Sequence, residues 1–235
     1  MTSQQGEVIF RYKDAPDPRG QAVLVIDTLR ATTTMTTILA HGAVGIRAVA
    51  ALADAYRLKA ESPEVLLGGE RENRPPEGFD GGNSPYDYPR ERVAGKRVVF
   101  STTNGTHAIE HVEAADRIGL AALVNRAAAA RWLSRWDSPW LIVAAGSEGQ
   151  IALEDVLAAG AIVDMLPETQ WGDGAKIAQA TYHRYRDDLL NGLYAASHGQ
   201  ALIQSGLTRD LEFCAQVDIF DLVPTLNDEG WFIPR

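Results

Sequence analysis

Short apolar runs alternate with longer amphipathic segments along most of the chain. The apolar runs predict strands, and the segments between them, where apolar residues recur every three or four positions, predict helices. The expected strands are residues 8–12, 22–27, 45–49, 65–68, 98–101, 120–124 and 141–145, and the expected helices are residues 32–41, 51–61, 106–115, 126–136 and 153–166. This alternation predicts an α/β fold with three α/β/α layers around a mainly parallel or mixed sheet.

The pattern changes in the last third of the chain. Residues 173–216 predict a helical C-terminal portion, followed by a late edge strand at residues 218–223. No repeat or Pro/Ser-rich linker divides the sequence, so residues 1–235 are expected to form a single domain, with two tightly packed subdomains as the alternative. Residues 69–92 are the one long irregular stretch, and their glycines and prolines predict an ordered functional loop.

Polar side chains follow most of the predicted strands at their carboxyl ends, the edge at which parallel α/β sheets bind ligands. They are Asp27 with Arg30, Glu70 with Arg71, the TTNGT segment from Thr102 to Thr106, Asn125, and Glu154 with Asp155. The run Thr32, Thr33, Thr34 begins a predicted helix, where hydroxyls and backbone N–H groups favour an anion. The sequence therefore predicts an anion or phosphate site at this edge.

Each of these groups also has a purely structural interpretation. Asp27 is well placed to cap the next helix, and the TTNGT turn could simply connect two elements. Arginines are usually solvated, and acids in the first turn of a helix stabilise its dipole. His107 and His111 lie four apart on one predicted helix, where a solvated face is favoured over a metal site. Only the joint occurrence at strand ends favours function.

Composition narrows the classes of partner. A net charge of −9 argues against nucleic acid or an anionic membrane as the main partner, because both require a basic face. A small anionic substrate stays compatible, since local arginines or a metal ion reverse the field. The single cysteine, Cys214, excludes an intrachain disulfide. The N-terminus has no secretory pattern and no apolar run suits a bilayer, so a cytoplasmic protein is expected.

Several signatures of phosphoryl chemistry are missing. The sequence contains no GxxxxGK[ST] loop and no GxGxxG turn after a strand. An aspartyl-phosphate enzyme of the haloacid dehalogenase type would carry a second Asp where Leu29 stands. Cys214 lacks the following Arg of a cysteine phosphatase, and there is no Arg-His-Gly triplet. These routes are excluded.

Several separated motifs resemble, in order, those of the 2-phosphosulfolactate phosphatase family of coenzyme M biosynthesis, and the similarity spans nearly the whole chain. The motifs are VIDTLRATTT (25–34), GERENRPPEGFDGGNSP (69–85), TTNGT (102–106), AAGSEG followed by ALEDVLAAGAIV (152–163), and SHGQALIQSGL (197–207). The resemblance implies a magnesium-dependent phosphatase with a three-layer α/β fold that converts 2-phospho-3-sulfolactate to 3-sulfolactate and phosphate.

The resemblance also suggests roles for the residues at the strand ends. Mg²⁺ binds through carboxylates, waters and substrate phosphate oxygens, which makes Asp27, Glu70, Asp80, Glu154 and Asp155 the candidate ligands. Asp27 and Arg30 are expected to act in catalysis, with water or Asp27 itself as the nucleophile. The expected substrate-binding residues are Arg71, Asn83, Ser84, Thr32, Thr33, Thr102, Thr103, Asn104, Gly105 and Thr106.

Two other functions stay open. A relative acting on another small anionic phosphoester would use the same site. A non-catalytic anion-binding protein would use the same helix starts and arginines but would need no metal-binding carboxylates, and the acids at the strand ends argue against it. Trp132, Trp136 and Trp140 fit an interior position and a contact between copies equally well, so a homo-oligomer also stays open.

Overall fold

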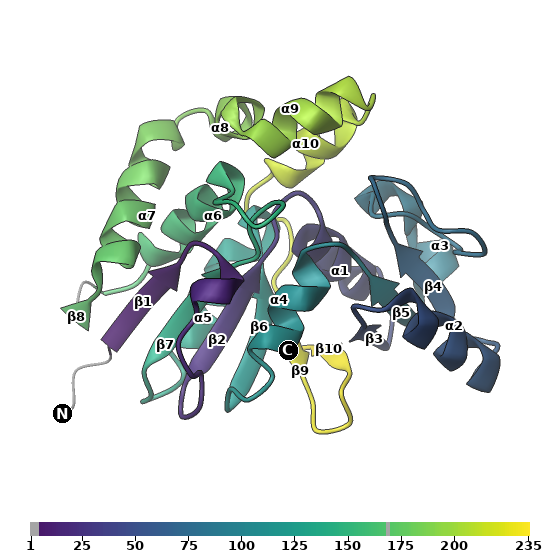
Figure 1. Ribbon diagram of the computed structural model, residues 1–235. Helices are drawn as coiled ribbons and strands as arrows, with labels where there is room; N and C mark the ends of the chain where they lie inside the picture. Colours follow the sequence, from purple (N-terminus) through teal and green to yellow (C-terminus); the bar gives the residue numbers. More distant parts are fainter. Residues whose placement is uncertain (1–4, 168–169) are drawn as a thin grey trace.

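The computed structural model describes residues 5–167 and 170–235, and its strands form one sheet (Figure 1). The strands are β1 (Gln5–Ile9), β2 (Ala22–Ile26), β3 (Gly45–Ala48), β4 (Leu66–Gly69), β5 (Arg97–Ser101), β6 (Arg117–Ala121), β7 (Trp140–Ala144), β8 (Gln170–Trp171), β9 (Pro224–Leu226) and β10 (Phe232–Pro234). Their order across the sheet is β4-β5-β3-β10-β9-β6-β2-β7-β1-β8. Every strand expected before residue 150 is present, with boundaries displaced by a few residues.

Helices connect and cover these strands. They are α1 (Ala31–Ala40), α2 (Leu52–Glu61), α3 (Arg90–Val93), α4 (Gly105–His111), α5 (Arg126–Leu133), α6 (Leu153–Val163), α7 (Asp173–Tyr185), α8 (Leu189–Ala195), α9 (Ser197–Gln204) and α10 (Thr208–Cys214), with short 3-10 turns η1 (Tyr12–Asp14), η2 (Pro85–Asp87) and η3 (Leu123–Asn125). The α/β class and the helical C-terminal portion are confirmed. In the described part of the chain, none of the helices combines the length and apolar character needed to cross a bilayer.

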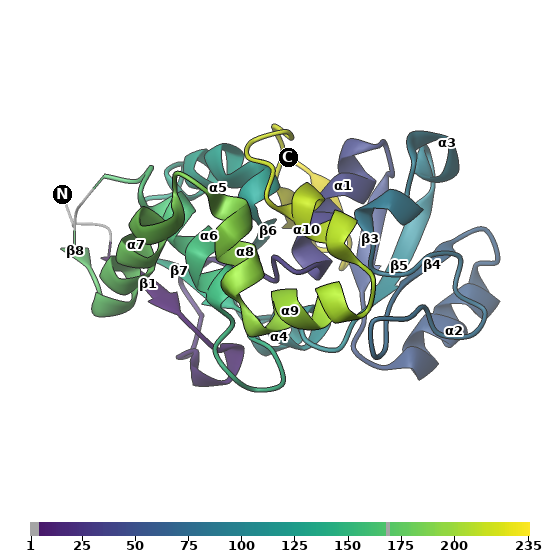
Figure 2. The ribbon, with the colours of Figure 1, turned by 90° about the horizontal axis from the view of Figure 1, so that it is seen from above.

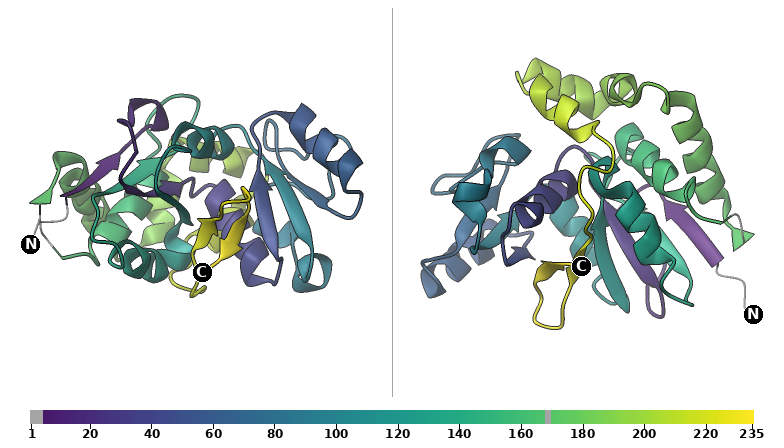
Figure 3. Two further views of the ribbon diagram at one scale, coloured as in Figure 1. Left: turned by 90° about the horizontal axis from the view of Figure 1, so that it is seen from below. Right: turned by 180° about the vertical axis from the view of Figure 1, so that it is seen from behind.

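The sheet consists of two parallel groups joined by a hairpin. Strands β6, β2, β7, β1 and β8 pair in parallel, as do β3, β5 and β4. The β9–β10 hairpin lies between them and pairs antiparallel with β6 on one side and β3 on the other (Figure 3). Three successive antiparallel pairings reverse the direction, so the two parallel groups run in opposite senses along the sheet.

The predicted edge strand at residues 218–223 is wrong. This segment is irregular, and Asp218 there accepts hydrogen bonds from Arg126 Nε at 2.9 Å and from the Ala127 N–H at 2.7 Å. The chain pairs only afterwards, in β9 and β10, and it does so in the middle of the sheet. Strands of three residues are too short to show a periodic pattern, which is why the hairpin was not predicted.

Strand β2 explains the layering. All five of its residues are buried, as expected for a central parallel strand covered on both faces. Because side chains alternate along a strand, Leu24 and Ile26 face the core made with α5, α6 and α7, and Val23 and Val25 face the core made with α1 and α4. Helix α2 packs against β4 and β5 at the far end of the sheet.

The last three helices form a separate layer, here called the roof and defined as α8, α9 and α10. Seen from above, the roof lies over the carboxyl ends of the central strands (Figure 2). Its apolar side chains, including Leu193, Leu202 and Leu211, pack around Leu29 from the turn between β2 and α1. The roof is thus anchored directly on the turn that the sequence singles out.

Candidate active site

A cavity of about 500 Å³ lies between the strand ends and the roof. The turns after β2, β4, β5 and β7 line it, so the carboxyl ends of both parallel groups reach the same space. Helix α9 closes it from above. The lining residues are Asp27, Leu29, Glu70, Arg71, Glu72, Asn73, Asn83, Thr103, Asn104, Ser147, Glu148, Ser197, His198 and Ala201.

Asp27 stands at the end of β2 and caps α1, because its Oδ1 accepts the Ala31 N–H at 3.2 Å. Its Oδ2 lies against Gly105, where a Cβ would approach that oxygen to 2.8 Å, so only glycine fits there. The pKa of Asp27 is raised to about 6, mainly by burial; the negative charges of Glu70 and Glu154 act in the same direction, and His198 and the Ala31 hydrogen bond oppose them. Asp27 thus bonds the first N–H of α1, although the N-cap position itself is Arg30, and the carboxyl group also faces the cavity.

Glu70 joins the turns after β4 and β5. Its Oε1 accepts both the N–H and the hydroxyl of Thr103 at 2.9 Å, and its Oε2 accepts the Asn73 N–H at 3.0 Å. Just before it, Gly69 has φ of +126°, and a Cβ there would lie 1.9 Å from the Ser101 carbonyl oxygen. The close approach of β4 to β5 therefore requires glycine, and it brings Glu70 to the cavity wall.

The two candidate arginines are both held by protein groups. Arg71 lines the cavity and donates to the carbonyls of Glu70 and Ala50, each at 2.6 Å, and to Ser101 Oγ at 2.9 Å. Arg30 is 2% exposed, does not line the cavity, and pairs with Asp210 of α10. Arg71 thus presents its charge to the cavity, whereas Arg30 links the β2–α1 turn to the roof.

Glu154 and Asp155 begin α6, and both are 2% exposed. Asp155 accepts the N–H groups of Thr28 at 2.8 Å and Gly146 at 3.1 Å. Burial raises its pKa well above the usual range, and the charges of Glu154 and Asp27 add to the shift. Glu154 Oε1 lies 3.4 Å from His198 Nδ1, while its Oε2 is buried with no hydrogen-bond partner in the described structure.

His198 reaches the cavity from α9. Burial opposes its charged form, but the contact with Glu154 and the nearby Asp27 charge outweigh that effect and raise its pKa. A histidine held between two acids favours the imidazolium, which donates protons and attracts anions.

The threonines are turned into the protein. Thr32, Thr33 and Thr34, here called the threonine turn, donate their hydroxyls to backbone carbonyls of Ala121 or Asp27, of Thr28 and of Asn83. Thr106 donates to the Thr102 carbonyl at 2.7 Å, and Thr102 Oγ1 accepts the Thr106 N–H at 3.3 Å. These hydroxyls were expected to bind substrate. They instead satisfy the buried backbone around the turns.

Of three further predicted site residues, Asn83 lines the cavity, and Ser84 and Asp80 do not. Asn83 lines the cavity and is 7% exposed, and its Oδ1 is a second buried atom without a partner among the described residues. Ser84 does not line the cavity, and its hydroxyl donates to Asp210 at 2.8 Å. Asp80 also lies outside the lining, because its Oδ2 accepts the Leu67 N–H at 2.8 Å and faces Lys59 at 3.7 Å.

The donor set fits a hard divalent cation. Asp27 lines the cavity, Glu154 Oε1 contacts the lining residue His198, and Glu154 Oε2 has no hydrogen-bond partner among the described residues. Within the described ranges no three His, Cys, Asp or Glu side chains converge into a complete ligand set. Mg²⁺ takes one or two protein carboxylates and completes its shell with water and phosphate oxygens.

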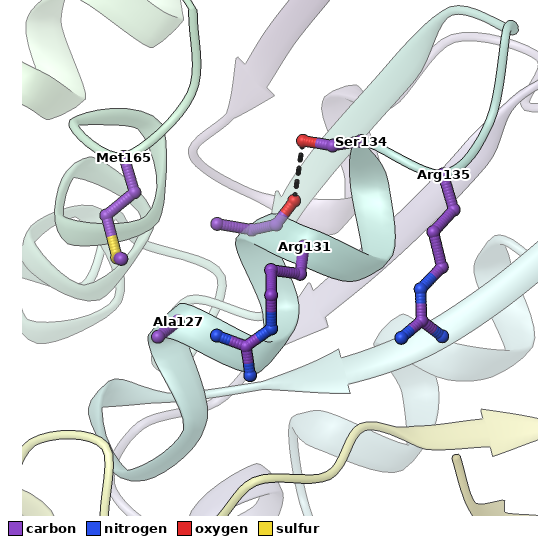
Figure 4. A pocket seen from close by; sticks show the side chains of 6 residues that line it. Ala127, Arg131, Ser134, Arg135 and Met165 are labelled. Atoms are coloured by element: carbon purple, nitrogen blue, oxygen red, sulfur yellow. Dashed lines mark hydrogen bonds between the residues drawn. The ribbon is translucent and has the colours of Figure 1, made fainter.

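A second hollow lies on the outer surface of α5 (Figure 4). Its walls are Ala127, Ala130, Arg131, Ser134, Arg135 and Met165, none of which lines the larger cavity. It contains no carboxylate, so it lacks the groups for metal-assisted chemistry. His107 and His111 are also elsewhere: His107 is half exposed beside Glu110, and His111 packs edge-on against Tyr12. The solvated-face interpretation of these histidines is the one the geometry supports.

Sequence reasoning missed the residues that the roof contributes. His198 and Ser197 line the cavity, and Asp210 pairs with Arg30 across 180 positions of sequence. Spacing gives no signal for such distant pairs. The motif at residues 197–207 was the available signal, since it begins with Ser197 and His198.

Comparison with known proteins adds an independent finding. A model of the family described as 2-phosphosulpholactate phosphatase matches residues 10–229. A relative from Caldanaerobacter subterraneus subsp. tengcongensis is 38% identical over 217 residues, covering 90% of each chain. One from Thermotoga petrophila is 39% identical over 213 residues (91% of this chain, 92% of the relative). One from Synechocystis sp. is 40% identical over 216 residues (88% and 89%). All three bear the name "Probable 2-phosphosulfolactate phosphatase".

Proposed function

The chain belongs to the 2-phosphosulpholactate phosphatase family, and from that premise we propose that it hydrolyses 2-phospho-3-sulfolactate to 3-sulfolactate and inorganic phosphate in a Mg²⁺-dependent reaction. As a member of this family it is a phosphoric monoester hydrolase. The acid-rich cavity is the observation that supports the cofactor most directly.

The charge balance of the cavity calls for a cation. Its lining carries the acids Asp27, Glu70, Glu72 and Glu148 against one arginine and one histidine. A phosphoester would be repelled by such a surface unless a cation neutralised it first. The same acids argue against a protein that only binds anions, because that function would not need them.

We assign the metal to the two carboxylates whose oxygens are not fully bonded to protein. Asp27 Oδ2 and Glu154 Oε2 would hold Mg²⁺, while Glu70 and Asp155, whose oxygens already accept backbone N–H groups, fix the shape of the site. Bound there, Mg²⁺ supplies charge neutralisation at the phosphoryl oxygens. Arg71 adds a second positive charge to the same cavity.

The chain's own groups would manage the protons. Asp27, whose Oδ1 accepts the Ala31 N–H and whose Oδ2 is assigned to the metal, would orient the attacking water and would not act as its base. His198, on the roof side of the cavity and with a raised pKa, would give a proton to the leaving alkoxide. Asn83 and Asn104 would bind the remaining anionic groups of the substrate. Direct attack by water is favoured over attack by Asp27, since the Asp27 carboxyl also caps α1.

Phosphate release from synthetic 2-phospho-3-sulfolactate and a panel of small phosphoesters, with Mg²⁺ and with EDTA, tests the proposal. We expect metal-dependent turnover that is fastest on the sulfolactate ester. Faster turnover of another ester would keep the chemistry and change the substrate. Absence of turnover of every ester by folded protein with metal would contradict the proposal. Rapid acid quench with ³²P-labelled ester separates the two nucleophiles, because only attack by Asp27 leaves labelled protein.

A further inference from the structure

Three segments distant in sequence meet at one buried carboxylate, Asp210 of α10. Its Oδ1 accepts the hydroxyl proton of Ser84, at 2.8 Å, from the long loop after β4. Its Oδ2 accepts from the Arg30 guanidinium, which belongs to the turn after β2. The side chains of Arg30 and Asp210 are only 2% and 4% exposed. This cluster therefore ties the roof to two walls of the cavity without itself lining the cavity.

Both branches of the cluster lead to an asparagine in the cavity. Ser84 follows Asn83 directly, and Thr34 Oγ1 donates to the Asn83 carbonyl at 2.8 Å, so the chain is held at two points directly after the Asn83 side chain, whose Oδ1 has no partner among the described residues. On the other branch, Arg30 Nη2 lies 3.5 Å from Asn73 Oδ1. Asn73 and Asn83 both line the cavity. A fixed backbone with an unpartnered buried amide is the arrangement of a preorganised binding group.

We propose that Asp210 is a positioning residue for substrate recognition, acting through Ser84 on the Asn83 amide and through Arg30 on Asn73. The inference rests on the proposed function and adds to it the part of the site that recognises the substrate beyond its phosphoryl group. In Asn73, whose Oδ1 faces Arg30, the Nδ2 group is left to donate to a sulfonate or carboxylate, and an amide does so without adding to the charge of the cavity.

A purely structural role makes a different prediction. If Asp210 only held the roof in place, breaking the cluster would lower thermal stability and the fraction of active enzyme, and KM would stay unchanged. A positioning role predicts a higher KM in fully folded protein, well below the unfolding temperature. Measuring KM and kcat separately therefore distinguishes the two roles, whereas a single activity value does not.

Ser84→Ala is the sharpest variant, because it removes the hydrogen bond to Asp210, together with a longer one of 3.4 Å from the Tyr86 N–H, and keeps the buried ion pair. We expect KM for 2-phospho-3-sulfolactate to rise about tenfold, the equivalent of one hydrogen bond. Inhibition by inorganic phosphate should change less than about twofold, since the phosphoryl group binds elsewhere in the cavity. Ser84→Thr, which keeps the hydroxyl, should restore the wild-type KM. Asp210→Asn should raise KM further and also lower the melting temperature, because Arg30 loses its counter-charge.

Asp218→Asn is the matched control. Asp218 pairs with Arg126 and so ties the segment after α10 to helix α5, but neither residue lines the cavity. We expect a lower melting temperature and an unchanged KM. An unchanged KM in Ser84→Ala, or no rescue by Ser84→Thr, would overturn the assignment of Asp210.

A binding assay separates a failure of the proposed function from a failure of the role assigned to Asp210. If wild-type protein turned over no ester, calorimetric titration with 3-sulfolactate would still compare the same variants. A loss of affinity of about tenfold in Ser84→Ala and its recovery in Ser84→Thr would uphold Asp210 as a positioning residue. Equal affinities, or no binding by wild-type protein, would overturn it.

Discussion

The threonine turn and the carboxylates of Asp27 and Glu154 are both buried, but the two sets of side chains differ in how their polar atoms are hydrogen-bonded. Thr32, Thr33 and Thr34 are fully buried, and each hydroxyl bonds a backbone carbonyl. By contrast, Glu154 has an oxygen with no partner in the described chain, and burial raises the pKa of Asp27 to about 6. Buried polar groups are normally satisfied. The threonine hydroxyls therefore stabilise the backbone, whereas the carboxylates are the groups that we propose as metal ligands.

Asp27→Asn should produce the largest effect, because it removes a charged metal ligand while the amide oxygen can still accept the Ala31 N–H. We expect kcat to fall by about a thousandfold or more, measured as phosphate release with Mg²⁺. The far-ultraviolet circular dichroism should match wild type. Near-normal activity in this variant would remove Asp27 from the chemistry and leave it only the capping role.

The same variant should also change how the unfolding free energy depends on pH. Burial raises the pKa of Asp27 to about 6 from 3.8, so the folded state binds more protons than the unfolded state between these values. The unfolding free energy therefore falls as pH rises through this window. Without metal, Asp27→Asn should match wild type near pH 4 and exceed it at pH 7, by at most about 3 kcal/mol. Urea unfolding in EDTA across this range measures the gap, and a gap that does not grow with pH would contradict the shift.

Gly105→Ala tests how tightly Asp27 is held. The added Cβ would lie 2.8 Å from both Asp27 Oδ2 and the Ala31 Cβ. We expect about a tenfold loss in kcat from the displaced carboxylate and about 2 kcal/mol of destabilisation from overpacking. Gly149→Ala is a useful comparison, because Gly149 has open space around it, although its φ of +76° adds backbone strain. Wild-type kcat in Gly105→Ala would show that the position of Asp27 is not critical.

Thr33→Val should have the smallest effect and fall on stability alone. The change keeps the shape of the side chain, removes the hydrogen bond of 2.9 Å to the Thr28 carbonyl and leaves that acceptor buried. We expect about 1–2 kcal/mol less unfolding free energy in urea and unchanged kcat and KM. A rise in KM without loss of stability would place the threonine turn among the substrate-binding groups after all.

Local pattern predicted the strands that carry the site, because each is a short buried run followed by polar residues. The turns after β2, β4, β5 and β7 line the cavity as expected, whereas Asn125 after β6 does not line it and bonds the backbone instead. The opposite senses of the two parallel groups depend on the β9–β10 hairpin, whose strands are too short to be read from sequence. Residue type alone could not show that the threonine hydroxyls bond the backbone.

Contacts between residues far apart in the sequence could not be predicted either. The roof brings His198 to Glu154 and Asp210 to Arg30, and neither pair has any spacing relation in the sequence. Arg30 was expected to neutralise the phosphoryl group directly. The structure buries it against Asp210 instead, because an arginine away from solvent needs an opposite charge. The Mg²⁺ dependence, the coenzyme M pathway and the cytoplasmic location stay predictions.

Calorimetric titration of Mg²⁺ into metal-free wild type, Glu154→Gln and Thr33→Val tests the comparison most directly. We expect one binding event in wild type, the same affinity in Thr33→Val, and at least about tenfold weaker binding in Glu154→Gln, since only that change removes a proposed carboxylate ligand. Equal affinity in wild type and Glu154→Gln would contradict the assignment of the unpartnered carboxylate to the metal.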